Sequence, residues 1–452
     1  MADPIFSLGP CSLTLSRLRY CTFTIIGITL LWPWNCFLSA SAYYGQRLAH
    51  TPSFVKIYSL TMMTVSTIVS TTYSCYLSQA QRGVDYRQRI CIGLVVTIVV
   101  FALMAVSCVS DWFIRMNDRV FLTFLMGMVL VSAMATCLAQ NGTMATVNLL
   151  SQVYINAVMV GQAIAGTLTA LALIVSVLVV GASPRTAAEN GTYVDKNYGV
   201  FVYYITASLI SVASIALLAL TGYIQTEAQY LNLNMLFEEG SADMGVGPSD
   251  DLDNWKPGTD DAVPSPANHA FVPFSVLWAK LKLIVMTIFV TFSVSLLFPV
   301  FAAVVESVHT DSPSRFFQKS IYIPFIYFVW NLGDLFGRVL CGAANSVFLV
   351  SNPTHLINYA MLRFLFIPLL MTCNIHPSGL VPIVASDTWY ILLQFLFGFS
   401  NGQLATSCFM VVGDHCDSDD EKKAAGGSTT VFLNMGLAVG SALSYLLVFF
   451  IG

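Results

Sequence analysis

Charged residues are scarce in this sequence of 452 residues. Only 10% of the residues are Asp, Glu, Lys or Arg, whereas 56% are hydrophobic, and the formal net charge is −4. A soluble globular protein has about 25% charged residues, because they cover its surface. The composition therefore excludes an ordinary soluble enzyme and a disordered protein, and the lack of a basic excess disfavours a nucleic-acid partner.

Signatures of metal binding, disulfide frameworks and catalysis are also missing. The 11 cysteines form no CxxC pair, and five of the six histidines lie at the ends of apolar segments or in short loops. No phosphate-binding glycine loop, HExxH motif or nucleophile elbow occurs. We therefore expect no enzyme and no cofactor or metal.

The sequence instead contains long uncharged runs. A transmembrane helix needs about 20 mostly apolar residues, and the gaps between charges supply eleven such segments. The predicted fold is an all-α polytopic membrane protein. Its expected spans are 20–44, 54–79, 89–111, 120–145, 149–181, 198–224, 274–305, 318–346, 354–373, 387–413 and 424–450.

One acidic stretch interrupts the apolar pattern. Residues 226–272 contain nine acidic residues, one lysine and four prolines, a composition typical of a disordered linker. A passive tether and a regulatory or sorting role both remain open. The linker separates a six-helix bundle (20–225) from a five-helix bundle (273–452), and residues 1–19 precede the first span.

The loops suggest an orientation. Ten Lys and Arg residues lie on the side of the N-terminus and eight on the other side, a slight bias that places the N-terminus in the cytosol. The sequon at Asn190 then lies outside the cytosol, where it is a glycosylation candidate. The host membrane is expected to be the plasma membrane or that of a vacuole or lysosome.

Only three charged residues lie deep inside the predicted spans: Asp334, Arg338 and Arg363. A charge at the centre of a membrane helix costs about 2.5–3.5 kcal/mol on insertion scales, so such residues usually face the bundle interior. Asp334 and Arg338 share a helical face with Asn331, and Tyr327 lies one turn earlier. The spacing fits either an ion pair that locks helices together or a row that binds a solute.

Uncharged polar side chains recur on other spans. The first span places Leu31, Trp34, Asn35 and Leu38 on one face, and the fourth contains Gln140 in a polar stripe. Amide side chains on several helices favour a polar route through the centre of the bundle.

Periodic polar and small residues mark further spans. Asn148, Gln152 and Asn156 recur every four residues in the fifth span. Pairs of glycines four residues apart allow helices to approach closely, as static packing or as a contact that slides during a conformational cycle. These pairs are Gly333/Gly337, Gly398/Gly402 and Gly436/Gly440.

Short motifs also occur in order along seven spans. They are Pro33-Trp34-Asn35, Gln140, Gly161-Gln162 with Ala165-Gly166, Asn331 to Arg338, Arg363, Phe399-Ser400-Asn401-Gly402 and Gly436 to Gly440. Together they resemble the equilibrative nucleoside transporter family. The resemblance implies eleven helices in a 6+5 arrangement similar to the major facilitator fold, with a cytosolic N-terminus. Gln403 departs from the family, in which Tyr is frequent, and this could alter the choice of base.

The resemblance further implies facilitative transport of nucleosides such as uridine and adenosine by alternating access, with the bilayer as partner and no obligate protein partner. The expected substrate contacts are Leu31, Trp34, Leu38, Gln140, Tyr327, Asn331, Asp334 and Arg338. Residues expected to have structural or gating roles are Asn35, Gln162, Arg363, Asn401, Gly402, Gly436 and Gly440. A proton-coupled nucleoside or nucleobase transporter, or a carrier of another small neutral or cationic solute, remains an alternative.

A nucleoside is uncharged, so its site should be electrically balanced. We expect Asp334 to accept hydrogen bonds from ribose hydroxyls and Arg338 to donate to the ribose or the base. Gln140 can both donate and accept, as a base edge requires. Trp34 and Tyr327 would offer apolar faces to the base.

Overall fold

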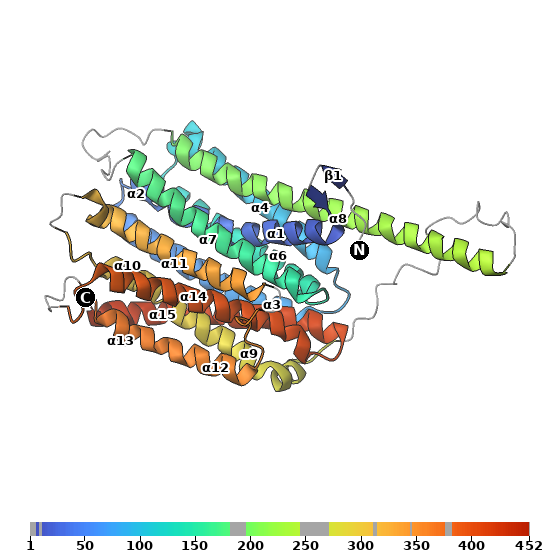
Figure 1. Cartoon of the computed structure of the whole chain (residues 1–452). Helices are drawn as coiled ribbons and strands as arrows, with labels where there is room; N and C mark the ends of the chain where they lie inside the picture. The colour runs from blue at the N-terminus through green and yellow to red at the C-terminus, as the bar shows by residue number, and fades with distance from the viewer. Residues whose placement is uncertain are drawn as a thin grey trace.

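The computed structural model is almost entirely helical, and its long helices run side by side in one bundle (Figure 1). It describes residues 6–8, 11–180, 196–244, 271–310, 314–343, 346–375 and 382–451.

The chain begins with a short antiparallel hairpin and continues into the first group of helices. The hairpin consists of β1 (Phe6–Leu8) and β2 (Cys11–Leu13). What we call the N-terminal group contains α1 (Leu15–Ser39), α2 (Ser41–Arg47), α3 (Pro52–Gln79), α4 (Tyr86–Val109), α5 (Asp111–Ile114), α6 (Asp118–Val147), α7 (Gln152–Val180) and α8 (Tyr198–Met244).

The second half of the chain supplies the other helices. What we call the C-terminal group contains α9 (Phe274–Ser295), α10 (Phe298–Val304), η3 (Arg315–Phe317), α11 (Lys319–Cys341), α12 (Pro353–Leu362), η4 (Arg363–Leu365), α13 (Phe366–Met371), α14 (Asp387–Val411), η5 (Val412–His415) and α15 (Asp419–Ile451).

The helices have the length and composition of membrane spans. Among the described residues, ten helical segments are long and apolar enough to cross a bilayer. α11 has a comparable length but contains Asp334 and Arg338. Large apolar side chains such as Ile68, Val99 and Leu209 are exposed on the bundle, where lipid would cover them. The protein is a multi-pass integral membrane protein, as predicted.

Prolines divide two of the predicted spans. Pro299 cannot donate a hydrogen bond to the carbonyl of Ser295, and α9 ends at Ser295 before α10 begins. Pro368 likewise leaves the carbonyl of Phe364 without its helical partner, and the chain forms the 3₁₀ turn η4 there, between α12 and α13. The expected spans 274–305 and 354–373 are therefore broken helices.

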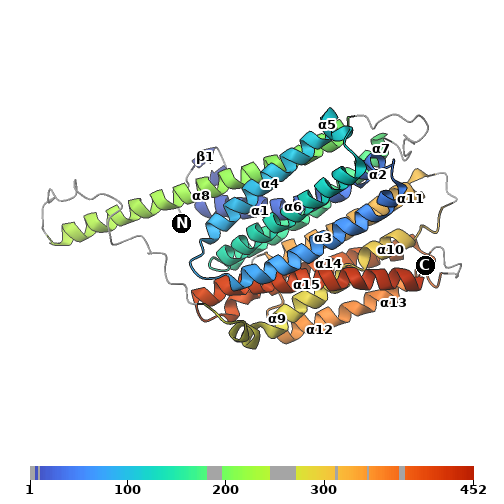
Figure 2. The same cartoon turned by 180° about the vertical axis from the view of Figure 1, so that it is seen from behind.

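α8 is longer than predicted. It was expected to end near residue 224 but continues to Met244 and projects beyond the other helices in both views (Figures 1 and 2). The sequence from 226 to 244 contains many Leu, Glu, Gln, Ala and Met residues and no proline, so helix propensity exceeds the effect of its acidic charge. This part of the expected linker is helical, and residues 245–270 lie outside the described part of the chain.

Each group packs mainly on itself, and the two groups meet along two lines. α7 contacts α11 and α14 on one side of the bundle, while α15 contacts α3 and α6 on the other (Figures 1 and 2).

The two ends of the bundle have different cores. At the end where α6 finishes and α15 begins, both groups share one hydrophobic core that includes Ile26, Val158, Leu281 and Phe409. At the opposite end each group has a separate core. We call these the shared end and the split end.

Candidate functional site

Asp334 and Arg338 form a buried ion pair on α11. Arg338 Nε donates to Asp334 Oδ2 over 2.9 Å, and Arg338 Nη2 lies 3.4 Å from Oδ1. Only 5% of the Asp334 side chain and 7% of the Arg338 side chain are exposed. A single charge buried away from water would destabilise the fold, and the opposite charge of its partner offsets much of that cost.

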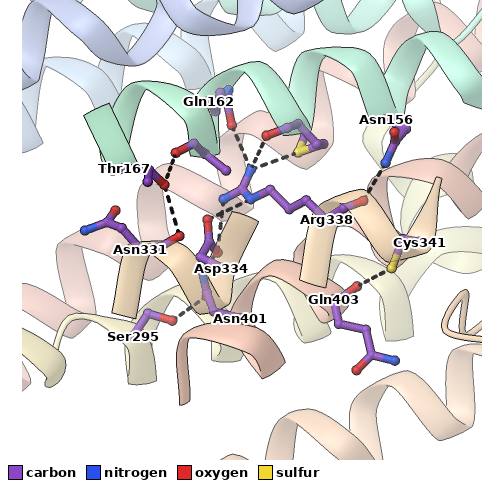
Figure 3. Close-up of polar contacts among 12 residues, drawn as sticks. Asn156, Gln162, Thr167, Ser295, Asn331, Asp334, Arg338, Cys341, Asn401 and Gln403 are labelled. Carbon is purple, nitrogen blue, oxygen red and sulfur yellow. Dashed lines mark hydrogen bonds and ion pairs between the residues drawn. The ribbon is translucent and has the colours of Figure 1, made fainter. Parts of the chain in front are cut away.

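The same guanidinium group also contacts α7 (Figure 3). Arg338 Nη1 donates to the main-chain carbonyl of Met159 over 3.0 Å and lies 3.4 Å from Gln162 Oε1. The ion pair therefore lies where the N-terminal group meets the C-terminal group, and Arg338 binds both.

Two further hydrogen bonds join α7 to α11 on either side of this contact. Asn156 Nδ2 donates to the carbonyl of Arg338 over 2.7 Å, and Thr167 Oγ1 donates to the carbonyl of Asn331 over 3.2 Å. We call the contacts from Asn156 to Thr167 with α11 the central seam. On the opposite side of the bundle, Asn434 Nδ2 of α15 donates to Ser74 Oγ of α3 over 2.7 Å, so hydrogen bonds join the two groups along both lines of contact.

A polar network extends from Asp334 through α14. Asn401 Nδ2 donates to Asp334 Oδ1 over 2.6 Å, and Ser295 Oγ donates to Asn401 Oδ1 over 2.5 Å. Arg363 donates to Ser295 Oγ over 2.9 Å and to Ser400 Oγ over 3.1 Å. Arg363 is fully buried and is held by neutral acceptors. Both carboxylate oxygens of Asp334 are thus occupied by protein donors.

Glycines hold α11 and α14 in backbone contact. A Cβ at Gly402 would collide with the carbonyl of Asp334, and one at Gly398 with the carbonyl of Trp330. This proximity brings Asn401 to Asp334. Gly436 and Gly440 pack in the same way on α9, so all three glycine pairs pack inside the C-terminal group and not between the groups. Static packing, one of the two interpretations, accounts for them in this structure.

The substrate contacts predicted in the N-terminal group do not bond to the ion pair, whereas Gln162, predicted to have a structural or gating role, does. Leu38 is 39% exposed, and Leu31, Trp34 and Asn35 are half-buried, with Asn35 Nδ2 enclosed without a hydrogen-bond partner among the described residues. Gln140 is 8% exposed, and no described residue pairs with its amide. An interior amide with unused donors and acceptors is what a polar ligand requires.

Aromatic rings lie beside the seam on the C-terminal group. Tyr327 meets Phe298 edge-on at 4.8 Å, and Phe298 stacks on Trp330 at 4.7 Å. Asn331 Nδ2 donates to the carbonyl of Tyr327. Sequence reasoning did not include Trp330, although its indole Nε1 is buried without a partner among the described residues.

The three amides predicted on the fifth span bond to the C-terminal group; Asn148 caps the end of α6, and Gln152 and Asn156 lie on α7. Asn148 donates to the carbonyl of Lys422 over 3.1 Å, and Gln152 to Asp414 over 2.7 Å, while Asn156 bonds to α11. These amides join the two groups in this structure. A stripe of amides identifies a polar face but not its partner.

Two other sequence expectations concern residues away from the ion pair. The Gln403 amide points away from Arg338 and bonds to Tyr359 and to the carbonyl of Phe348 (Figure 3). Asn190 lies outside the described residues. Within the described part of the chain, no cluster of His, Cys, Asp or Glu could hold a metal ion.

The fold is shared with transporters of known structure. A solved proton:xylose symporter, XylE, of the major facilitator superfamily matches 96% of this chain and 88% of its own with a TM-score of 0.55 and 9% identity. At this identity the match shows the fold alone. The helical bundle, with its buried polar contact between two groups of helices, therefore has the fold of this solved symporter.

Sequence comparisons identify the family. The nucleoside transporter family model matches residues 126–449. Nucleoside transporter FUN26 of Saccharomyces cerevisiae is 37% identical over 99% of this chain and 87% of its own, and equilibrative nucleoside transporter 2 of Rattus norvegicus is 27% identical over 94% and 95%. The chain belongs to the nucleoside transporter family, which confirms the resemblance inferred from the motifs.

Proposed function

We propose that this protein carries nucleosides such as uridine and adenosine across a membrane by facilitated diffusion. The observation that supports the proposal most directly is the position of the Asp334–Arg338 pair. It lies at the contact between the two helical groups, where a substrate bound at midplane would touch both. The names of the relatives point to the same substrate class.

The substrate would contact Leu31, Trp34, Leu38, Gln140, Tyr327, Asn331, Asp334 and Arg338, with no cofactor involved. In this conformation Arg338 Nη1 is bonded to the carbonyl of Met159. Opening of the central seam would free that donor, and a ribose hydroxyl could then replace the carbonyl. Substrate binding would in this way be coupled to the movement of one group against the other.

The remaining topology belongs to the same proposal. Eleven spans form a 6+5 arrangement, in which residues 20–225 and 273–452 rock around the site and the N-terminus lies in the cytosol. The split end then faces away from the cytosol. The host membrane is the plasma membrane or that of a vacuole or lysosome.

Flux measurements in proteoliposomes test this function. Purified protein should take up labelled uridine and adenosine down their gradients, and unlabelled nucleosides should compete better than sugars or organic cations. Liposomes with Asp334→Asn serve as the impaired control. Better competition by another solute class would overturn the nucleoside assignment.

The same liposomes address energy coupling and base recognition. An imposed pH gradient should not drive accumulation against the substrate gradient, and if it does, the proton-coupled alternative replaces facilitated diffusion. Gln140→Ala should change the ratio of purine to pyrimidine uptake. Equal losses for all substrates would remove Gln140 from base recognition.

A further inference from the structure

Two adjoining cavities lie at the split end, outside the contact between the two groups. The first has a volume of about 530 Å³, and its lining includes Arg47, His50, Thr51, Arg115 and Arg119. We call it the basic cavity. The second has a volume of about 490 Å³ and a mainly apolar lining that includes Asp111, Trp112 and Val120. We call it the apolar cavity. Arg115 and Met116 line both, so the two are neighbours. The charge of Asp111 is paired with Lys196, whose Nζ lies 3.4 Å from Asp111 Oδ1.

The charges of the basic cavity do not cancel. Arg47 forms a buried ion pair with Asp118 at 3.1 Å, and Thr51 Oγ1 donates to the second oxygen of that carboxylate over 2.9 Å. Asp118 is thus satisfied. The guanidinium groups of Arg115 and Arg119 have neither an ion-pair nor a hydrogen-bond partner among the described residues. They leave an excess of two positive charges at this cavity.

The apolar cavity lies at the level of a membrane interface. The segment that forms it lies between α4, which ends at Val109, and α6, which begins at Asp118; both helices have the composition of membrane spans. Trp112 is 68% exposed and Val120 is 55% exposed. Tryptophan is enriched at the headgroup level of bilayers because its ring is amphipathic.

We propose that these cavities bind one anionic phospholipid. Arg115 and Arg119 hold the phosphate, for which a guanidinium offers paired N–H donors in the matching geometry. The glycerol and the first part of an acyl chain lie along Trp112 and Val120. The Arg47–Asp118 pair holds the basic cavity in shape, since Arg47 Nη2 also donates to the carbonyl of Phe113 over 2.9 Å.

Thermal unfolding of the full-length protein in detergent tests the proposal. Phosphatidylglycerol should raise the melting temperature more than phosphatidylcholine does, and the variant Arg115→Gln with Arg119→Gln should lose most of the difference. Both side chains are exposed and unpaired, so the variant should fold. The matched control is Arg82→Gln with Lys282→Gln, which removes two exposed charges at the shared end and should keep the full shift.

Two further measurements separate a lipid from a free anion. Inorganic phosphate alone should give little of the shift. Trp112→Ala should reduce the number of phosphatidylglycerol molecules retained in native mass spectrometry. The proposal is wrong if phosphate reproduces the whole shift, if the control variant loses as much as the double variant, or if Trp112→Ala retains as much lipid as the wild type.

Discussion

The shared end and the split end differ in how the two helical groups meet. At the shared end one hydrophobic core includes residues of both groups, and Asn148 and Gln152 bond across to Lys422 and Asp414. At the split end each group has its own core. The contacts between the groups are therefore concentrated at one end, and a carrier that alternates its access must break those contacts in each cycle.

The glycines of α15 contact different groups of helices at different points along the helix. Gly426 and Gly427 let α15 approach α6 and α3 at the shared end, where Gly426 faces the main chain of Met144 and Ala145. Gly436 and Gly440, further along the same helix, face α9 of their own group. One helix therefore has one glycine pair at a contact between the groups and another at a contact within a group.

The largest losses of stability and flux are expected when one of the two buried ion pairs is broken. Arg338→Ala and Arg47→Ala each leave a buried carboxylate without its cation, which costs about 3–5 kcal/mol of stability. Of these two arginines, only Arg338 bonds across the central seam. Its loss alone should therefore also reduce uridine flux per folded protein, by about tenfold or more, equivalent to about 1.4 kcal/mol. Unfolding curves and proteoliposome flux measure the two effects separately. Equal flux losses in both variants would show that the contact of Arg338 across the central seam has no particular role in transport.

Alanine substitutions at two glycines of the shared end test whether close packing of the groups there is needed for transport. A Cβ at Gly426 would lie 2.8 Å from Ala145 N and Met144 C, whereas one at Gly413, also at the shared end, would lie 3.7 Å from Asn148 O. Gly426→Ala should therefore keep this end from closing and slow transport several-fold, and Gly413→Ala should not.

Spin-label distances between residues 88 and 282, one in each group, check this glycine prediction. Both positions are exposed at the shared end. The mean distance should increase in Gly426→Ala and stay unchanged in Gly413→Ala. An unchanged distance in Gly426→Ala would mean that the helices adapt without opening.

Much of the fold could be predicted because membrane helices are encoded by length and hydrophobicity. The ends of α4, α6 and α14 lie within a few residues of the predicted limits. The breaks at Ser295 and Phe364 follow from Pro299 and Pro368 but were not predicted, since a proline inside an apolar run does not by itself show whether the helix bends or ends.

The site was only partly predictable. The i, i+4 spacing of Asp334 and Arg338 indicated a common face, and the structure pairs them. The acceptor on α7 is the main-chain carbonyl of Met159, a group that every residue has and no sequence pattern singles out. The amides of α7 were visible in the sequence, but their partners depend on how the two groups pack.

A moderate effect is expected at the edge of the central seam. Asn156→Ala removes the hydrogen bond to the carbonyl of Arg338, worth about 1 kcal/mol net. Because this bond joins the groups, its loss should lower the stability of the present conformation and change flux a few-fold. Thr64→Ala is the control, since Thr64 Oγ1 bonds only within α3, to the carbonyl of Leu60. Flux and melting temperature that match the control would contradict the assignment.

The smallest effect is expected at a contact of the shared end that lies within one group. Lys280 Nζ is 2.7 Å from Asp417 Oδ2, and the hydrogen bond from the Lys280 ammonium lowers the pKa of Asp417 below its ordinary value of 3.8. A lowered carboxyl pKa adds stability above the unfolded value, and that stability is lost as the pH falls through the folded value. Asp417→Asn should therefore leave uridine flux at neutral pH unchanged and alter the unfolding temperature only slightly, since Asp417 is solvent-exposed and salt screens the pair. A clear loss of flux would show that contacts within the C-terminal group, and not only those between the groups, control the shared end.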